Sequence, residues 1–225
     1  MWFPNYPYAL GYSYARPGDK AKSLDRFCDR LIEAGPESTW VDLGGGAAAR
    51  PMQALRRRLE ERGDTKKSAR MICVDPRAGD LYTTVPSSSL VKADLREYVI
   101  PDDTFLVTCF GALCCASGFC RMRGDRVKFP GEEEPTNKDS PSLEPFTSSV
   151  REITASLVQR MPPGSEMCIS VPEHITIGVT RALWGTHNRN NGVVDMTANS
   201  PQSELRASVY AQYDAPRIVT VRKCS

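Results

Sequence analysis

Apolar residues recur along this chain at two spacings, one typical of helices and one typical of strands. Helical spacing predicts three helices, from about residue 24 to Gly35-Pro36, through Met52, Leu55 and Leu59, and over about 145–161. Short apolar runs predict buried strands over 40–43, 71–74, 90–94, 104–110 and 167–171. Two alternating runs, 207–213 and 217–221, are separated by Asp214-Ala215-Pro216 and predict a terminal antiparallel hairpin.

The order of these elements indicates the α/β class. Strands that alternate with helices form a mostly parallel sheet with helices on its faces. We therefore expect a Rossmann-like fold with an antiparallel C-terminal hairpin. One domain is predicted over 1–225, with an N-terminal arm and helix over 1–35, a mobile loop over 131–145 and an irregular, lid-like segment over 181–200.

Length and composition suit a single core. The 225 residues are 40% hydrophobic and 25% charged, which is enough for one full-sized domain but not for two. No run approaches the roughly 20 apolar residues of a membrane-spanning helix, and the first residues lack the basic start of a secretory signal. We expect a cytoplasmic protein with no membrane partner, in the host cytoplasm if it is viral.

The eight cysteines are predicted to be reduced thiols in a reducing compartment. Several lie in apolar runs that are typical of core strands: Cys73, Cys109, Cys114, Cys115 and Cys168. The group from Cys109 to Cys120 lacks the paired C-x-x-C spacing of structural zinc sites, and no histidine lies nearby. No metal is therefore expected.

Charge alone does not identify a partner, because the formal net charge is only +2. Two local clusters are basic: Arg56-Arg57-Arg58 with Arg62, and Arg121 and Arg123 with Arg126 and Lys128. Each can be an ordinary solvated face, and the second also allows contact with phosphate.

A glycine-rich turn directly follows the first predicted strand. In Asp42-Leu43-Gly44-Gly45-Gly46 the glycines let backbone approach a ligand without obstruction by side chains, at the start of a helix. Asp75 ends the next strand and is expected to accept hydrogen bonds from the two ribose hydroxyls of an adenosine. Asp94 is a candidate acceptor for the adenine amino group. A nicotinamide cofactor is disfavoured because the G-x-G-x-x-G spacing is incomplete.

The glycine turn, the second-strand acid and the terminal hairpin resemble class I S-adenosylmethionine-dependent methyltransferases over most of the chain. The details resemble FtsJ-like and viral cap RNA methyltransferases. Val74-Asp75-Pro76-Arg77 is similar to the Ile-Asp-Gly-Arg segment of the poxvirus cap ribose enzyme, a lysine-bearing helix precedes the turn, and Ser203-Glu204-Leu205-Arg206 is similar to a late element of those enzymes. The resemblance implies S-adenosylmethionine as cofactor and adds Arg77 and Cys109 to its site.

The ribose enzymes of this resemblance use a Lys-Asp-Lys-Glu tetrad. Lys20 or Lys22 matches its first position and Glu204 its last. The aspartate position after the fourth strand instead contains Cys109, and the fifth strand has no lysine. A ribose hydroxyl needs deprotonation, whereas guanine N7 already carries a lone pair, so the incomplete tetrad favours N7 as the acceptor.

Three hypotheses about function follow. The first is an RNA methyltransferase acting on a capped 5' end, at guanine N7 or at the ribose 2'-hydroxyl, with a protein partner from a capping or replication complex. The second is a catalytically inactive methyltransferase-like domain that serves as a binding or assembly module. The third is a methyltransferase for a small molecule or a protein. An intact cofactor turn favours the first and third, and the empty tetrad positions favour the second.

Overall fold

The structure is a computed structural model. It describes residues 17–110, 112–116, 121–123, 126–128, 144–172, 194–199 and 216–223.

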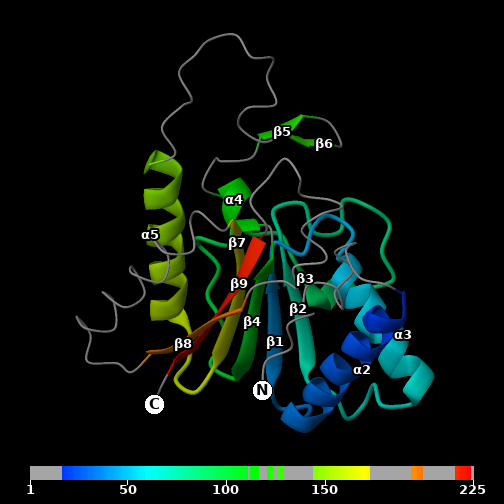
Figure 1. Cartoon of the computed structure of the whole chain (residues 1–225). Helices are drawn as coiled ribbons and strands as arrows, with labels where there is room; N and C mark the ends of the chain where they lie inside the picture. The colour runs from blue at the N-terminus through cyan, green and yellow to red at the C-terminus, as the bar shows by residue number, and fades with distance from the viewer. Residues whose placement is uncertain are drawn as a thin grey trace.

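A seven-stranded sheet lies at the centre of the described part of the chain (Figure 1). Its strands stand in the order β3-β2-β1-β4-β7-β9-β8. The bounds are β1 Thr39–Leu43, β2 Arg70–Val74, β3 Leu90–Val91, β4 Thr104–Phe110, β7 Glu166–Pro172, β8 Val194–Asn199 and β9 Pro216–Lys223. The pairs from β3 to β7 are all parallel, whereas β9 runs antiparallel to both β7 and β8. This is the predicted Rossmann-like, mostly parallel fold with an antiparallel C-terminal pair.

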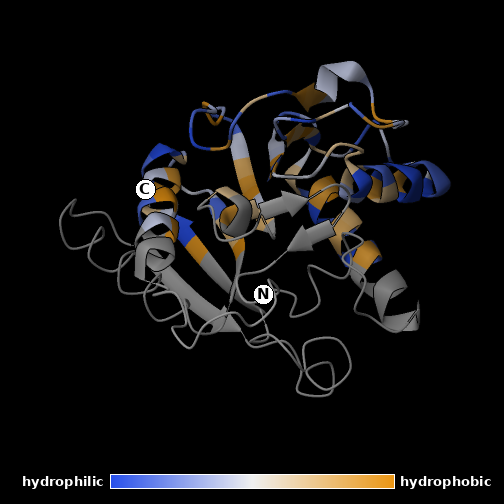
Figure 2. Ribbon diagram, turned by 90° about the horizontal axis from the view of Figure 1, so that it is seen from above, coloured by the Kyte–Doolittle hydropathy of each residue, from blue (hydrophilic) through white to orange (hydrophobic). Residues whose placement is uncertain are grey.

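Helices cover both faces of this sheet (Figure 1). They are α2 Pro17–Ala34, α3 Arg50–Arg62, α4 Ala112–Ala116 and α5 Glu144–Arg160. Neighbouring residues of a strand point to opposite faces. Trp40 of β1 therefore packs with Phe27 of α2 and Leu55 of α3, whereas Val41 packs with Leu157 of α5. Figure 2 shows the hydrophobic residues gathered along the central strands and on the inner sides of the helices.

The ends of α3 follow from its sequence. Pro51 lies in the first turn, where a missing backbone N–H removes no helical hydrogen bond. Gly63 ends the helix at a φ of 71° and donates its N–H to the carbonyls of Leu59 and Glu60. The helix therefore begins at Arg50, after Gly46 and three alanines, and ends before β2.

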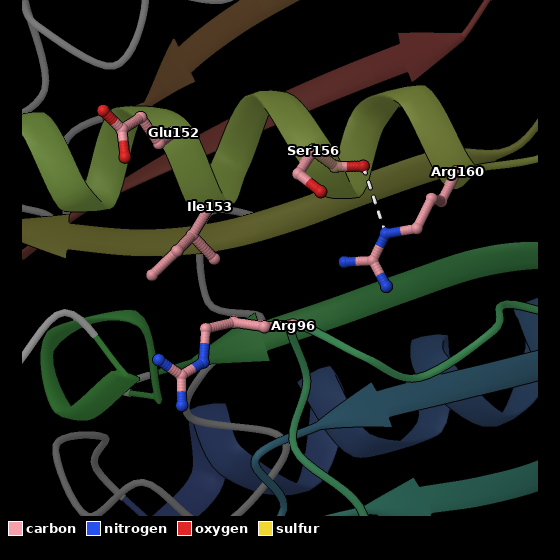
Figure 3. Close-up of a pocket in the computed structure, with 5 residues that line it drawn as sticks. All are labelled: Arg96, Glu152, Ile153, Ser156 and Arg160. Carbon is pink, nitrogen blue, oxygen red and sulfur yellow. Dashed lines mark hydrogen bonds between the residues drawn. The ribbon is translucent and has the colours of Figure 1, made fainter.

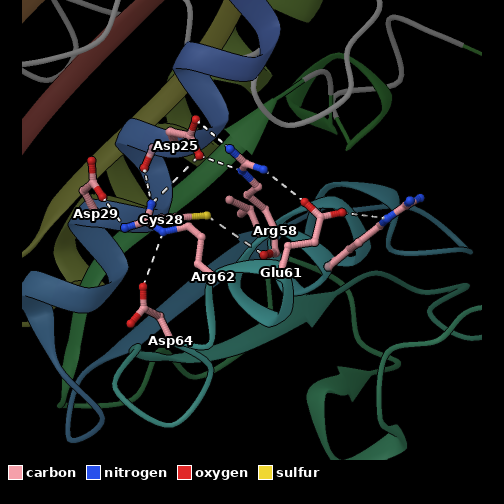
Figure 4. A network of polar contacts seen from close by, with 9 residues as sticks. Asp25, Cys28, Asp29, Arg58, Glu61, Arg62 and Asp64 are labelled. Carbon is pink, nitrogen blue, oxygen red and sulfur yellow. Dashed lines mark hydrogen bonds and ion pairs between the residues drawn. The ribbon is translucent and has the colours of Figure 1, made fainter.

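Ion pairs join α2 to α3 on the outer surface (Figure 4). Arg58 donates to both carboxylate oxygens of Asp25, at 2.6 and 3.0 Å. Arg62 donates to Asp29 at 2.6 Å and also contacts Asp64 at 3.3 Å. The basic cluster on α3 is thus paired with acids, as on an ordinary solvated face. The second basic cluster lies on a separate hairpin, β5 Arg121–Arg123 with β6 Arg126–Lys128, and its contact with phosphate stays a prediction.

Most predicted elements agree with the structure. The runs that predicted β1, β2, β4 and β7 lie within one residue of the observed bounds at each end, and α5 is shifted by one residue from the predicted 145–161. β3 is shorter than predicted and ends at Val91. The reason is a turn at Asp94, whose carbonyl accepts from the N–H groups of Glu97 and Tyr98.

Two predictions at the C-terminal end are corrected. Part of the segment 181–200, which is predicted to be irregular, forms the strand β8, in which Val194, Met196 and Ala198 alternate with polar residues. Residues 181–193 and 200 lie outside the described part of the chain, and for them the prediction stays open. β8 is also the antiparallel partner of β9, in place of the predicted 207–213. Both edges of β9 are occupied from Ile218 to Arg222, by β7 and β8. Residues 207–213 lie outside the described part of the chain, as do 131–143 of the predicted loop.

The cysteines are partly as expected. Cys28, Cys73, Cys109 and Cys168 are buried and form no disulfide. Cys114 and Cys115 were predicted in a strand, but the structure places them on α4. In the residues that the structure describes, no helix is long and apolar enough to cross a lipid bilayer.

Candidate functional site

The order of the strands reverses between β1 and β4. From β1 the chain continues outward to β2 and β3, and it then returns to β4 and β7 on the opposite side. Connections at the carboxyl ends of β1 and β4 therefore diverge, and open α/β sheets bind ligands in the crevice outside the strand ends at such a reversal. The glycine turn, Asp75 and the start of α4 follow β1, β2 and β4 at this edge.

The three glycines of the turn have three different surroundings. Gly44 has a φ of +76°, and a Cβ built on it would lie 2.1 Å from the Cβ of Ala112. A Cβ on Gly45 would lie 2.6 Å from Asp42 Oδ2 and 2.7 Å from Cys73 Sγ. Gly46 has a φ of +81°, and a Cβ there would meet nothing within 4 Å. Gly44 and Gly45 are therefore required by packing, and only Gly46 faces open space.

Asp75 connects the glycine turn to the loop after β2. Its Oδ2 accepts from the Gly46 N–H at 3.1 Å, and its Oδ1 accepts from the Arg77 N–H at 2.8 Å. Each carboxylate oxygen can accept a second hydrogen bond. The half-buried carboxylate can therefore hold the turn and still accept from a pair of ligand hydroxyls.

The loop after β2 is fixed against the turn by its backbone. The N–H groups of Gly79 and Leu81 donate to the Ala47 carbonyl, at 2.9 and 3.4 Å. The Asp80 carboxylate accepts from Lys92 at 2.5 Å and lies 3.9 Å from the Arg77 guanidinium. The Arg77 side chain is exposed, and it belongs to this loop.

Asp42 lies beneath the turn. The Thr108 hydroxyl donates to Asp42 Oδ1 at 2.7 Å, and Trp40 Nε1 donates to that hydroxyl at 3.0 Å. The other oxygen, Oδ2, is buried and has no hydrogen-bond partner among the described residues. Burial is the main reason that the pKa of Asp42 is raised to about 7; the Thr108 hydrogen bond lowers the pKa, and the nearby Asp75 charge makes a smaller contribution that raises it. Asp42 is 1% exposed, and its Oδ2 lies close against Gly45 of the turn.

Asp94 lies beyond β3 and is held by its own loop. Arg96 donates to Asp94 Oδ1 from Nε at 2.8 Å and to Oδ2 from Nη2 at 2.5 Å, and its backbone N–H also donates to Oδ1 at 2.8 Å. The Arg96 hydrogen bond holds the pKa of Asp94 below its usual range. Contact between Asp94 and an adenine stays a prediction, and it would use the remaining acceptor sites of this carboxylate.

The Cys109 side chain is buried in the core, so contact of this residue with the cofactor, which stays a prediction, would have to use its backbone. The side chains of β4 alternate between the two faces, and Thr108 takes the position beside Asp42. Cys109 is fully buried on the opposite face, in the cluster that includes Val150 and Leu157 of α5. Its thiol therefore belongs to the core.

A hollow of about 200 Å³ lies beside α5 (Figure 3). It is lined by Arg96, Glu152, Ile153, Ser156 and Arg160. Arg160 donates to the carbonyls of Tyr98 and Leu95 at 2.6 and 3.2 Å, so it supports the turn between β3 and β4. The Arg160 guanidinium that lines this hollow therefore stabilises the backbone between β3 and β4.

The predicted catalytic residues are only partly within the described chain. Lys20 and Lys22 lie on the N-terminal half of α2, and Glu204 falls outside the described residues. Their convergence on one pocket stays a prediction. Thr108 and Ala112 are site residues that the sequence interpretation missed, because both act through strand pairing and packing, which no local pattern shows.

Comparisons with known proteins assign no family to this chain. No protein-family model matches the chain, and no curated protein matches its sequence. Among solved structures, the N-methyltransferase NodS from Bradyrhizobium japonicum WM9 is 10% identical with a TM-score of 0.46, over 93% of this chain and 98% of that one. An S-adenosylmethionine-dependent methyltransferase from Clostridium acetobutylicum ATCC 824 is 7% identical with a TM-score of 0.47, over 98% and 96%.

A third solved structure, the precorrin-6y C5,15-methyltransferase from Geobacter metallireducens GS-15, is 13% identical with a TM-score of 0.43, over 96% of this chain and 94% of that one. Similarities this weak carry no weight for function. The Rossmann-like fold is assigned from the strand order and register of the sheet itself.

Proposed function

We propose that this chain binds S-adenosylmethionine at the carboxyl edge of β1 and β2 and belongs functionally to the methyltransferases. The observation that carries this proposal is the bond between Asp75 and Gly46. It brings a carboxylate with spare acceptor sites next to a glycine that faces open space. A ribose with two adjacent hydroxyls matches that pair, and the sequence resemblance supports the same donor.

The bound donor supplies an activated methyl group, which passes to a lone pair on the acceptor while the carbon–sulfur bond breaks and sulfur keeps the electron pair. The residues of this chain bind and align the two reactants, and alignment can supply much of the acceleration. Asp75 accepts from the ribose hydroxyls, and Gly46 lets the backbone approach. Trp40 and Thr108 fix the Asp42 side chain, which packs against Gly45 of the turn.

The acceptor that we propose is the capped 5' end of an RNA, at guanine N7 in preference to the ribose 2'-hydroxyl. Thr108 is engaged with Asp42, and Cys109 is buried in the core. Neither offers a base at the end of β4, and guanine N7 needs none. The resemblance to viral cap enzymes supports RNA, together with a protein partner from a capping or replication complex. We place the activity in a reducing compartment such as the cytoplasm, where the buried thiols stay reduced.

A second candidate is a domain that binds the donor without catalysis and serves in assembly. The observation that favours it is the burial of Cys109 at the strand end where the related ribose enzymes have an aspartate. This candidate shares the cofactor site with the first and differs from it in the chemistry.

Titration calorimetry of the whole chain with S-adenosylmethionine and S-adenosylhomocysteine tests the cofactor. A transfer assay with donor labelled in the methyl group, on capped and uncapped RNA of one sequence, tests the acceptor. Binding with transfer to capped RNA alone supports the cap proposal. Binding without transfer to either RNA favours the assembly candidate, and no binding of either nucleoside overturns the proposed function.

A further inference from the structure

One tyrosine stands out on the rim of the crevice. Among the residues that the structure describes, three large apolar side chains are exposed, and they are Leu81, Tyr82 and Val99. Tyr82 is 88% exposed, on the loop that follows β2 and Asp75. The exposed faces of an aromatic ring can stack on a nucleic-acid base.

The backbone on both sides of Tyr82 is anchored. On its N-terminal side, the Leu81 N–H donates to the Ala47 carbonyl, which directly follows the glycine turn. On its C-terminal side, the Val85 N–H donates to Thr83 Oγ1 at 3.1 Å, and the Val85 side chain is buried. The ring is therefore displayed from a loop that is hydrogen-bonded to the crevice itself.

Two cations belong to the same rim. Arg77, on the loop of Tyr82, and Lys92, just after β3, both pair with the single carboxylate of Asp80. Their side chains stay 55% and 61% exposed. Asp80 lies on the loop that carries Tyr82, so both cations are held against that loop. Positive groups together with an exposed aromatic ring are the combination with which proteins bind single-stranded nucleic acid, through phosphates and stacked bases.

We infer that Tyr82 is a stacking platform for an unpaired base of the RNA substrate, with Arg77 and Lys92 beside it to contact phosphate. The inference rests on the proposed function, since it takes RNA as the acceptor. It adds a path for the strand, across the loops after β2 and β3. The methyl donor is a weaker candidate for this rim, because it has a base but no phosphate for the two cations.

The test is fluorescence anisotropy with a labelled single-stranded RNA of about ten nucleotides, on the full chain and three variants. Tyr82→Ala is expected to weaken RNA binding roughly 5- to 150-fold, the range for loss of one base–aromatic stack. Tyr82→Phe keeps the ring and is expected to stay within about twofold of the wild type. Val99→Ala, the matched control, removes another exposed apolar side chain and should bind as the wild type does.

Unchanged RNA affinity in Tyr82→Ala, or an equal loss in Val99→Ala, would overturn the inference. Calorimetry with S-adenosylmethionine on Tyr82→Ala separates the two bases that could stack here. Unchanged donor affinity supports RNA, whereas loss of donor binding assigns the ring to the adenine and overturns the inference. If the wild type binds RNA through Tyr82 but binds no donor, the proposed function fails and the platform stands. If the wild type binds the donor and Tyr82→Ala keeps its RNA affinity, the stacking platform is overturned and the proposed cofactor binding stands.

Discussion

The Thr108 hydroxyl donates a 2.7 Å hydrogen bond to Asp42 Oδ1 across the pair of strands where the order of the sheet reverses. The two residues are partners in the parallel register of β1 and β4. The same hydroxyl accepts from Trp40 Nε1 at 3.0 Å, so one small side chain joins the core to the carboxylate under the glycine turn. The candidate site therefore depends on a buried polar contact between the two strands that flank it.

Replacing Thr108 with valine keeps the shape and removes the hydroxyl. Trp40 Nε1 and Asp42 Oδ1 would then both lose a buried partner, and each unsatisfied group costs about 1 to 3 kcal/mol. We expect Thr108→Val to lower the free energy of unfolding, measured in urea, by that order. Thr104→Val is the control on the same strand, because Thr104 Oγ1 is buried with no hydrogen-bond partner among the residues that the structure describes. An equal loss in both variants would mean that the hydroxyl of Thr108 contributes nothing specific.

The elements that could be predicted from the sequence are those that a local residue pattern indicates. Apolar runs and helical spacing located β1, β2, β4, β7 and α3, and the glycine turn with Asp75 was found because both follow strands. The alternation in Val194 to Asn199 was a usable signal for β8, but it lay in a segment rich in turn residues. Partners across the sheet were not predictable from one chain. The hydrogen bond between Thr108 and Asp42 follows from the register of β1 and β4. The burial of Cys109 on the opposite face of the sheet follows from the alternation of side chains along β4.

Asp42 should make the stability of the protein depend on pH. Its pKa is raised by burial to about 7 in the folded protein, from an ordinary value of 3.8. The folded state then holds a proton that the unfolded state has released. This contribution to stability is fully present below the ordinary pKa of 3.8 and is lost as the pH rises through about 7. While the folded protein keeps the proton and the unfolded chain has released it, the free energy of unfolding falls by about 1.4 kcal/mol per pH unit.

The measurement is urea unfolding of the wild type and Asp42→Asn between about pH 5 and about pH 8. The variant carries no proton to lose, so its stability relative to the wild type should improve as the pH rises. Asp102→Asn, at an exposed position, should run parallel to the wild type. If the difference between Asp42→Asn and the wild type stays constant across this range, Asp42 does not titrate as described.

Asp75 is expected to matter more for the ligand than for the fold. Asp75→Ala removes the acceptors for two ribose hydroxyls, and we expect S-adenosylmethionine to bind more weakly by about 1 to 3 kcal/mol in calorimetry. Asp75→Asn keeps one acceptor oxygen, so its affinity for S-adenosylmethionine should lie between those of the wild type and Asp75→Ala. Asp102→Ala, at the exposed position used above, serves as the control and should bind like the wild type. Full affinity in a folded Asp75→Ala would refute the placement of the nucleoside.

The glycines of the turn should separate packing from ligand binding. In Gly44→Ala the new methyl would lie 2.1 Å from the Cβ of Ala112, and the φ of +76° adds backbone strain, so we expect a large loss of stability. Adding Ala112→Gly removes the clash but not the strain, so the double variant should recover part of that loss. Gly46→Ala meets only the strain, about 1 to 2 kcal/mol.

The methyl group of Gly46→Ala projects into the open space beside Asp75. We therefore expect this variant to stay folded in urea titrations. Its affinity for S-adenosylmethionine, measured by calorimetry, should fall. The double variant Gly44→Ala/Ala112→Gly is its matched comparison, because it carries the same kind of strain on the side of the turn that faces α4. It should bind the donor better than Gly46→Ala does. The opposite order of affinities would mean that the ligand lies over Gly44, against α4, and that the open side of the turn at Gly46 is not the binding face.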